Sequence, residues 1–367
     1  MESYKTLTLD AQTAYAQLFD AASALDFSRS VARLRGSFAS KTVKARKYWY
    51  FQHTDIAGKL QQIYVGPDSP RIRLLIEEHG ARRSFEAMQK LVNSAIALGC
   101  QPLLLPHFRV IRRLNDYGFF NAGGVLIGTH AFLAFGNMLG VRWGDSSRTQ
   151  DVDFAHAGKQ MAIALPSNLE IDTREAIDSL QMGFLPTLEM SGRVGASYLN
   201  PRDPSFQLDF LTPKSRSEEP YLHPALKIRL QPLKFMEYLL EDIQQTALFS
   251  AEGAVVANVP HPARYALHKL IVFAERSAMR RPKASKDLKQ AGALLSYFRN
   301  TSEWNVREAW SDLLSRGSGW RERAGRGRDA LAQAAPHLEL KRWLPMGKAA
   351  AKATAIAKTP PRGRARK

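Results

Sequence analysis

Apolar runs separated by glycine and polar turns predict alternating strands and helices through the middle of the chain. Residues 125–127 form a short apolar run of the kind that builds a buried strand. Gly128 and Thr129 end this run, and residues 131–139 have the pattern of a helix. The stretch therefore predicts a strand, a glycine turn and a helix start, where backbone N–H groups favour a bound phosphate.

Two further segments, residues 149–154 and 205–210, alternate between polar and apolar side chains as half-buried strands do. In such strands Asp151 and Asp153 share one face of the first, and Asp209 projects from the polar face of the second. Neighbouring carboxylates repel one another by about 4 kcal/mol per pair at about 4 Å and an effective dielectric of about 20. A divalent cation removes this repulsion, and Mg²⁺ suits oxygen ligands and phosphate partners.

Asp172 is a second candidate for the third carboxylate, since it ends the sequence Leu-Glu-Ile-Asp at residues 169–172. We prefer Asp209 because apolar and polar residues alternate more regularly around it. The segments at residues 149–154 and 205–210 are expected to join a mixed sheet with helices packed against it.

The N-terminal part predicts a helix over residues 9–35, a hairpin from two strands at residues 44–51 and 59–65, and helical structure over residues 71–98. Basic and aromatic residues alternate in the hairpin, which is typical of a surface that stacks bases and contacts phosphates. Aromatic residues are equally common in ordinary strands, so a plain hairpin is the alternative.

The C-terminal part has helical patterning after residue 261, with an interruption near residues 317–319. Its last 21 residues are rich in alanine, lysine and proline and low in bulky apolar residues, which predicts disorder. The predicted organisation is an N-terminal accessory domain of helix, hairpin and helix (1–104), a catalytic core (105–215), a C-terminal helical domain (216–346) and a disordered basic tail (347–367).

Charge and cysteine content narrow the classes of partner and compartment. The chain has 52 Lys and Arg against 34 Asp and Glu, a formal net charge of +18, which favours a polyanionic partner. A basic surface that serves only solubility is the alternative. A single cysteine, Cys100, excludes an internal disulfide and favours a reducing compartment. No signal peptide pattern and no apolar run of about 18 residues is present, so we expect a cytoplasmic location without membrane contact.

The glycine turn, the Asp-x-Asp strand and the later Asp resemble the nucleotidyltransferase superfamily, which has the polymerase-β-like fold. The resemblance covers residues 119–297 and is closest to bacterial stand-alone enzymes of the abortive-infection toxin type. It implies an α/β mixed-sheet core and Mg²⁺-dependent transfer of a nucleoside monophosphate from an NTP to an acceptor hydroxyl. The acceptor implied is RNA such as tRNA, with a protein hydroxyl or a small molecule as the alternatives, and a neutralising partner protein accompanies the toxin type.

The resemblance also assigns roles to individual residues. The metal-binding and catalytic residues would be Asp151, Asp153 and Asp209, and the nucleotide-binding residues would be Gly128, Thr129, Arg148, Lys269 and Asp287. Lys269 would offset phosphate charge, while Asp287 would orient Lys269 or contact the nucleotide. Without the resemblance, this pair is equally well explained as a solvated helix face.

A rival interpretation is a non-catalytic nucleic-acid-binding protein on a degenerate nucleotidyltransferase scaffold. Thr129 stands where serine is usual in the superfamily, and the basic tail provides an electrostatic surface without any catalysis. Label transfer from NTPs distinguishes the two interpretations.

Overall fold

The computed structural model describes most of the chain, in twelve segments. These are residues 3–33, 36–54, 60–78, 84–144, 152–156, 172–178, 180, 182–188, 194–214, 217–224, 226–276 and 281–346. The predicted disordered tail at 347–367 lies outside them. None of the described helices is long and apolar enough to cross a lipid bilayer.

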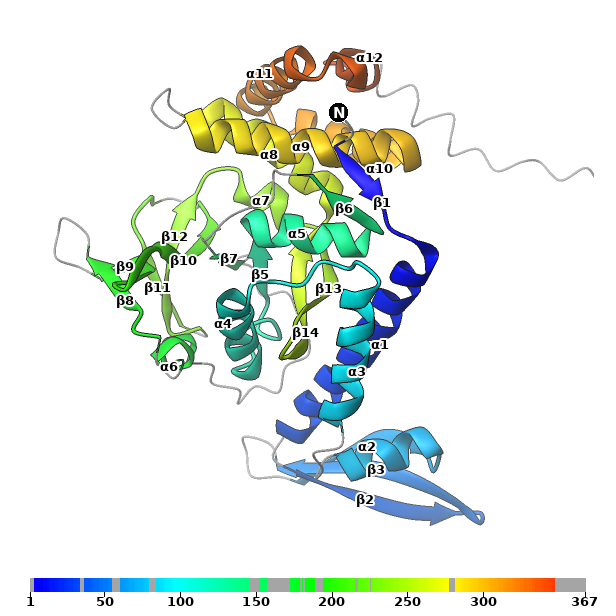
Figure 1. Ribbon diagram of the computed structural model, residues 1–367. Helices are drawn as coiled ribbons and strands as arrows, with labels where there is room; N and C mark the ends of the chain where they lie inside the picture. Colours follow the sequence, from blue (N-terminus) through cyan, green and yellow to red (C-terminus); the bar gives the residue numbers. More distant parts are fainter. Residues whose placement is uncertain are drawn as a thin grey trace, which may run out of the picture.

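A seven-stranded mixed sheet forms the centre of the molecule (Figure 1). Its strands are β5 (Gly124–Ile127), β7 (Val152–His156), β8 (Leu185–Leu188), β9 (Val194–Asn200), β10 (Asp203–Pro213), β11 (Tyr221–His223) and β12 (Ile228–Leu233). β10 is parallel to β7 and β12, and the other pairs are antiparallel. The strands predicted at 125–127, 149–154 and 205–210 correspond to β5, β7 and β10, which confirms the mixed α/β fold.

Helices and a second hairpin cover this sheet. They are α4 (Leu105–Asp116), α5 (Gly128–Met138), α6 (Thr173–Asp178), β13 (Ile243–Ser250) and β14 (Gly253–Pro260). One hydrophobic core runs from Phe108 of α4 through Leu126 and Phe210 of the sheet to Leu270 and Trp310 in the C-terminal helices. The buried face of the sheet therefore packs continuously against the helices that follow it.

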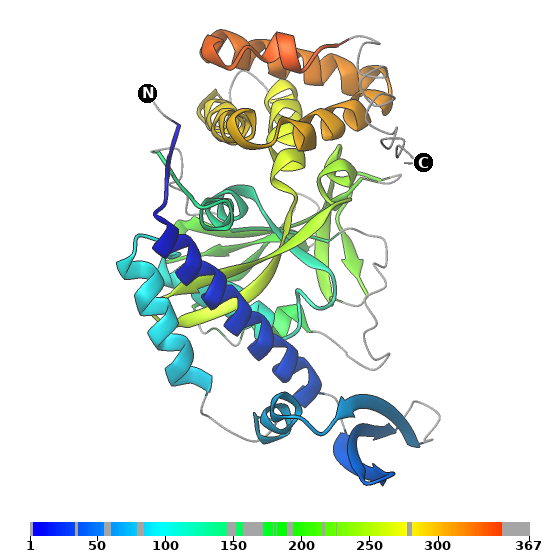
Figure 2. The same cartoon turned by 90° about the vertical axis from the view of Figure 1, so that its right-hand side faces the viewer.

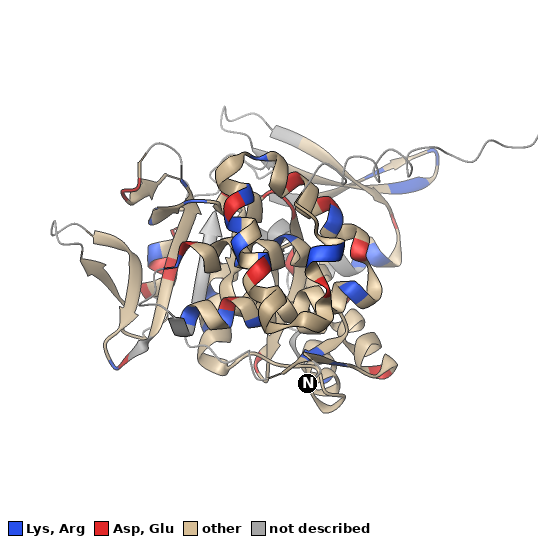
Figure 3. Ribbon diagram, turned by 90° about the horizontal axis from the view of Figure 1, so that it is seen from above, with Lys and Arg blue, Asp and Glu red and all other residues tan. Residues whose placement is uncertain are grey.

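The C-terminal helices pack above the sheet (Figures 1 and 2). They are α7 (Met236–Leu239), α8 (Pro262–Glu275), α9 (Arg281–Thr301), α10 (Glu303–Ser315), α11 (Ser318–Ala334), the 3-10 turn Pro336–Leu338 and α12 (Leu340–Trp343). α11 approaches α8 so closely that a Cβ at Gly327 would lie 2.2 Å from the carbonyl oxygen of Leu270, so only glycine fits there. Basic and acidic residues are interspersed over these helices in the view from above (Figure 3).

The predicted boundary between residues 215 and 216 falls inside this arrangement. β11 and β12 follow it in the chain, yet they extend the same sheet as β10. Residues 217–260 consequently hold mainly strands, and the long helices begin at Pro262. The division of the chain into domains stays a prediction.

The N-terminal segment packs on the core through its first strand and two helices. β1 (Tyr4–Thr6) pairs with β6 (Val141–Trp143), while α1 (Leu9–Arg33) and α3 (Ser84–Ala97) build a second small core with β13 and β14. Beyond the ends of these helices lies a sheet of β2 (Gly36–Val43), β3 (Arg46–Thr54) and β4 (Leu60–Pro67), with α2 (Pro70–Glu78) against it (Figure 1). The sequence predicted only a hairpin here, because the small and polar residues of β2 lack a strand pattern.

Candidate active site

One residue from each of four neighbouring strands of the central sheet lies in a single row across the sheet. The backbone register pairs Ile127 of β5 with Asp153 of β7, Asp153 with Asp209 of β10, and Asp209 with Ser197 of β9. We call these four register positions the carboxylate row. It places the backbone of Asp153 directly beside Asp209, although 55 residues separate them in the chain.

Asp209 lies on the more open face of β10. Phe206, Leu208 and Phe210 are buried, whereas Gln207 and Asp209 between them are half-buried, as the alternation in the sequence predicted. The Ser197 hydroxyl and the Gln207 amide both donate hydrogen bonds to Oδ1 of Asp209. These donors fix the carboxylate, and within the described residues no hydrogen bond reaches Oδ2.

Asp172, the alternative third carboxylate, has a different role. Its Oδ1 accepts a hydrogen bond of 2.9 Å from the backbone N–H of Glu175, so it caps the start of α6. Its Oδ2 lies 4.0 Å from Nζ of Lys227. Asp172 is therefore engaged at a helix terminus and has no place in the register of the carboxylate row.

The glycine turn follows Ile127 directly and begins α5. Gly128 has a φ of +67°, a left-handed conformation that disfavours any residue with a Cβ. The Tyr265 hydroxyl of α8 lies 2.7 Å from the carbonyl oxygen of Gly128 and 2.9 Å from Oε1 of Gln290 in α9. A hydroxyl has one proton, so it donates to one of these acceptors at a time. The Gln290 amide in turn donates to Oγ1 of Thr129 at 3.3 Å.

This buried network holds the turn in a defined orientation. The C=O and N–H groups of a trans peptide point in opposite directions, so anchoring the Gly128 carbonyl on Tyr265 turns the Thr129 N–H away from α8. That N–H belongs to the first turn of α5, where backbone donors have no partner within the helix. The turn can therefore offer an oriented donor to a phosphate oxygen.

A second cluster on α8 and α9 carries excess positive charge. Nζ of Lys269 lies 2.8 Å from Oδ1 of Asp287, and Arg276 donates to Oδ2 of the same carboxylate. We call Lys269, Asp287 and Arg276 the Lys269 cluster. Its side chains are 14%, 3% and 20% exposed, so two cations share one buried carboxylate and leave a net charge of +1. Lys269 also lies 5.2 Å from the centre of the Tyr265 ring, which links the cluster to the glycine turn.

Burial and neighbouring charges shift the pKa values of Asp287 and His268 in this part of the structure. Burial raises the pKa of Asp287, but Lys269 and Arg276 outweigh it and hold that pKa below its ordinary value. Burial, helped by the charge of Lys269, lowers the pKa of the neighbouring His268 to about 3. His268 is therefore neutral near pH 7, and its buried Nε2 has no hydrogen-bond partner among the described residues.

A pocket of about 650 Å³ adjoins the Lys269 cluster at the C-terminal end of α8. Its wall includes Arg276 of the cluster, together with Lys214 at the end of β10 and Lys234 after β12. Glu218 pairs with Lys214 and lies 3.6 Å from Lys234. Glu275 also lines the pocket, so three cations face two carboxylates, and the volume lies in the range of small-molecule sites.

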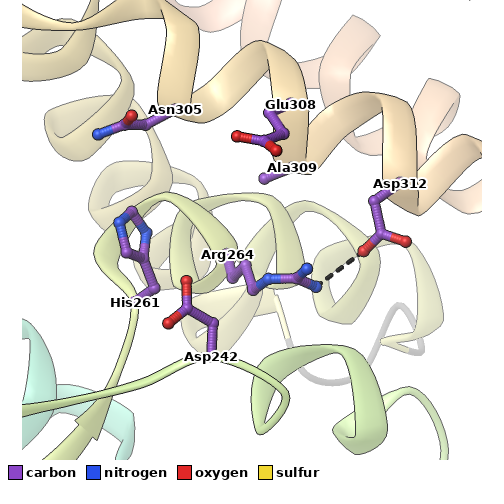
Figure 4. A pocket seen from close by; sticks show the side chains of 7 residues that line it. All are labelled: Asp242, His261, Arg264, Asn305, Glu308, Ala309 and Asp312. Carbon is purple, nitrogen blue, oxygen red and sulfur yellow. Dashed lines mark ion pairs between the residues drawn. The ribbon is translucent and has the colours of Figure 1, made fainter.

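A second pocket, of about 240 Å³, lies at the opposite end of α8 (Figure 4). It is lined by Asp242, His261, Arg264, Asn305, Glu308, Ala309 and Asp312. Arg264 lies 2.8 Å from Asp312, and Nδ1 of His261 accepts a hydrogen bond from the Ala263 N–H and caps α8. Three carboxylates against one arginine make this pocket unsuitable for a triphosphate.

The predicted site residues other than Asp209, which is described above, fall into three groups. Asp151 and Arg148 lie outside the described residues, and Asp153 is described through its backbone only. Gly128, Thr129, Lys269 and Asp287 are brought together by the contacts of α8 and α9. Their roles, like those of the three aspartates, stay predictions.

Three polar residues of the site were not assigned from the sequence. Tyr265 lies four residues before Lys269 on α8, and Gln290 lies three residues after Asp287 on α9, so each shares a helix face with a predicted residue. This spacing is the signal that could have found them. Arg276 directly follows the last residue of α8, and its pairing with Asp287 became visible only in the fold.

The residues of the carboxylate row that could ligate a metal are Asp153, Asp209 and Ser197, whose side chains offer oxygen atoms. Oxygen ligands suit Mg²⁺ better than a softer metal. Among the described side chains, no group of three or more His, Cys, Asp and Glu is arranged to hold a metal. The described side chains include Asp209 but exclude those of Asp151 and Asp153. The residue types in the row therefore fit Mg²⁺.

Comparison with known proteins identifies the family of the chain. The chain matches the family model for nucleotidyltransferases over residues 106–315, which is more than half of its length. No curated protein is significantly similar to it. A solved structure similar to the chain is that of an antigenic nucleotidyltransferase-like protein from Paracoccidioides brasiliensis, with 14% identity and a TM-score of 0.30 over 62% of this chain and 95% of that one. The family match spans the carboxylate row, the glycine turn and the Lys269 cluster, and the chain therefore belongs to the nucleotidyltransferase family.

Proposed function

We propose that the protein transfers a nucleoside monophosphate from an NTP to an acceptor hydroxyl and depends on Mg²⁺. The observation that supports this most strongly is the register of Asp153 and Asp209, side by side next to the Gly128 turn. Two strand positions with carboxylates, beside an oriented helix start, are the arrangement that an in-line displacement at phosphorus requires.

In the proposed reaction the acceptor oxygen attacks the α-phosphorus of the NTP. A bond forms between that oxygen and the α-phosphorus, the bond to the bridging oxygen of the β-phosphate breaks, and pyrophosphate leaves. The proton of the acceptor hydroxyl passes to the carboxylate of Asp209, which Ser197 and Gln207 hold in place. Asp151, Asp153 and Asp209 would hold Mg²⁺, which neutralises charge on the triphosphate when bound.

The other residues would position the triphosphate. Thr129 would donate its backbone N–H to a phosphate oxygen, since Tyr265 anchors the preceding carbonyl. Lys269 would offset phosphate charge, while Asp287 accepts a hydrogen bond from its ammonium group and keeps that group in place. The net charge of +1 in the Lys269 cluster favours an anion at this point.

RNA, and tRNA in particular, is the acceptor class that we propose, because the basic balance of the chain favours a polyanion. A protein hydroxyl is the second acceptor class. The similarity of Lys269 and Asp287 to the toxin-type arrangement extends the proposal to a cytoplasmic toxin held in check by a neutralising partner protein. Growth arrest on induction, relieved by a co-expressed neighbouring gene product, tests that extension.

The transfer reaction is tested with the full chain, Mg²⁺, total RNA and each of the four common NTPs labelled at the α-phosphate. The proposal expects label on RNA or protein, and its loss by at least about a thousandfold in Asp209→Asn, since a metal ligand and proton acceptor is removed. Asp172→Asn is the matched control, because it changes a carboxylate of the same core that caps α6, and it should keep transfer within about threefold.

Two outcomes contradict the proposal. Equal transfer by Asp209→Asn and Asp172→Asn would remove Asp209 from the site. Nucleic-acid binding without transfer from any NTP to RNA, protein or the chain itself would favour the non-catalytic binding protein.

A further inference from the structure

The small N-terminal sheet has one face that is partly covered, where Ile63 is still 51% exposed, and one open face. On the covered face Phe51 is 3% exposed and packs against Phe38, with ring centres 5.3 Å apart. α2 lies on this side, because a Cβ at Gly66 would be 2.6 Å from Cδ1 of Ile72. Trp49 donates to Asp68 at the start of α2, which fastens the helix to the sheet.

The opposite face carries three tyrosines, of which Tyr64 is exposed and Tyr48 and Tyr50 are half-buried. Register pairs place Tyr50 of β3 opposite Tyr64 of β4, and Tyr48 opposite Lys41 of β2. Tyr64 lies between the other two tyrosines, with ring centres 6.3 Å from Tyr48 and 5.5 Å from Tyr50. We call Lys41, Tyr48, Tyr50 and Tyr64 the tyrosine face. Tyr64 is 55% exposed, a high value for an aromatic residue in a sheet.

Basic side chains lie near these rings. Nζ of Lys41 lies 4.9 Å from the centre of the Tyr50 ring and donates to Oε1 of Gln62 on the same face. The β2–β3 hairpin, residues 36–54, carries four basic residues and no acidic one, and one of them, Lys47, lies 4.4 Å from the Trp49 ring on the opposite face. The two strands are joined by a turn at Lys44 and Ala45, which have positive φ values of 48° and 61°. Both turn residues are exposed, so the end of the hairpin is basic and open to solvent.

We propose that the tyrosine face binds single-stranded RNA. Exposed rings on a sheet stack against bases that no complementary strand covers, and nearby lysine and arginine side chains contact the phosphates. A duplex hides the flat faces of its bases, so it cannot use the rings. Gln62 adds an exposed amide on this face that can bond a 2′-hydroxyl, the group that separates RNA from DNA. This binding does not depend on the transfer reaction.

Binding is measured by the fluorescence anisotropy of a labelled ten-nucleotide oligouridine with the full chain. Tyr48→Ala/Tyr64→Ala should weaken binding by about tenfold or more for each ring that stacks a base. Tyr48→Phe/Tyr64→Phe keeps the rings and should bind within about threefold of the unmodified chain. Tyr221→Ala is the matched control, since Tyr221 is 40% exposed on β11 of the central sheet, and it should leave affinity unchanged.

Two further binding measurements distinguish base stacking on the rings from electrostatic attraction to phosphates. A labelled RNA duplex of the same length should bind equally to the unmodified chain and to the double alanine variant, because only phosphate contacts remain. A DNA oligomer of the same sequence should bind more weakly than RNA if the 2′-hydroxyl is recognised.

Crosslinking with 4-thiouridine in the same oligomer maps the contact on the unmodified chain, so it decides the question even if the alanine variant misfolds. The proposal expects crosslinked peptides within residues 41–64. Equal affinity of a folded double alanine variant and the unmodified chain, or crosslinks confined to residues 347–367 or to the central sheet, would overturn it. Transfer by a chain that fails this test would leave the proposed function standing.

Discussion

Helix α8 carries an ion-pair cluster near each end, and the two clusters differ in burial and net charge. The Lys269 cluster has two cations around Asp287, which is 3% exposed. The cluster at the other end consists of Arg264, Arg316, Glu241 and Asp312, which we call the Arg264 cluster. Its carboxylates are 48% and 32% exposed, and its two cations and two anions cancel.

The difference indicates that the Lys269 cluster is suited to bind an anion, whereas the Arg264 cluster holds helices together. The Arg264 cluster ties α8 to α7 and α10, and both arginines lie against the ring of Tyr238. Its charges are already balanced, so nothing is left for an anion. The Lys269 cluster lies beside the anchored Gly128 turn and places two cations around one carboxylate in a poorly hydrated place, where they act on a phosphate more strongly than in water.

The largest expected difference between the clusters is in stability. Asp287→Asn removes the buried carboxylate that pairs with the half-buried Lys269 and Arg276, which should lower the free energy of unfolding by about 3–5 kcal/mol. Asp312→Asn, in the more exposed cluster, should cost about 1 kcal/mol or less. Urea unfolding of both variants measures this, and equal losses would contradict the comparison.

The next expected difference is in activity. Lys269→Met keeps the apolar stem but removes the charge, and should reduce nucleotidyl transfer by about 10²–10³-fold. Arg264→Met changes a cation of the same helix at the balanced cluster and should leave transfer within about threefold. Comparison of kcat/KM for the two variants is the measurement. A similar loss in both would mean that α8 acts only as a scaffold.

The pH dependence of stability should also differ along α8. Burial lowers the pKa of His268 to about 3, so between about pH 6.5 and pH 3 the unfolded chain binds a proton that the folded chain does not. The free energy of unfolding should therefore fall by about 1.4 kcal/mol per pH unit as the pH decreases through this range, and His268→Gln should remove that slope. Burial also lowers the pKa of His261, but Asp242 opposes this, so His261→Gln should change the slope less. Parallel profiles for the unmodified chain and His268→Gln would contradict the prediction.

The smallest effects are expected from two buried hydroxyls. Tyr265→Phe removes the anchor of the Gly128 carbonyl, and Tyr238→Phe removes a hydrogen bond of 2.9 Å to the Ala309 carbonyl. Each should cost about 1 kcal/mol in unfolding free energy. Only Tyr265→Phe should also raise the KM for NTP, because the Thr129 N–H loses its orientation. An equal rise in both variants would show that the anchor has no specific role.

Local patterns in the sequence predicted the strands and the helix starts of the core. Alternation around Asp209 correctly indicated which residues of β10 are buried, because this depends only on neighbours in the chain. The third strand of the N-terminal sheet was missed, since Gly36–Val43 forms a strand through its pairing with β3 rather than through its own propensity.

The candidate site could be predicted only in part, because its contacts join distant segments. Tyr265 reaches Gly128 across 137 positions, and no periodicity in either segment indicates that contact. Asp172 and Asp209 looked alike as isolated acids; only the strand register and the cap of α6 distinguish their surroundings. The Lys269–Asp287 pair was found through resemblance, whereas Arg276 required the fold.

The most direct test is a crystal structure of the chain with Mn²⁺ in place of Mg²⁺ and a non-hydrolysable NTP. The account predicts anomalous density for Mn²⁺ between Asp153 and Asp209, with the phosphates extending toward the Gly128 turn and Lys269. Metal and nucleotide bound elsewhere, with the carboxylate row contacting neither, would contradict it.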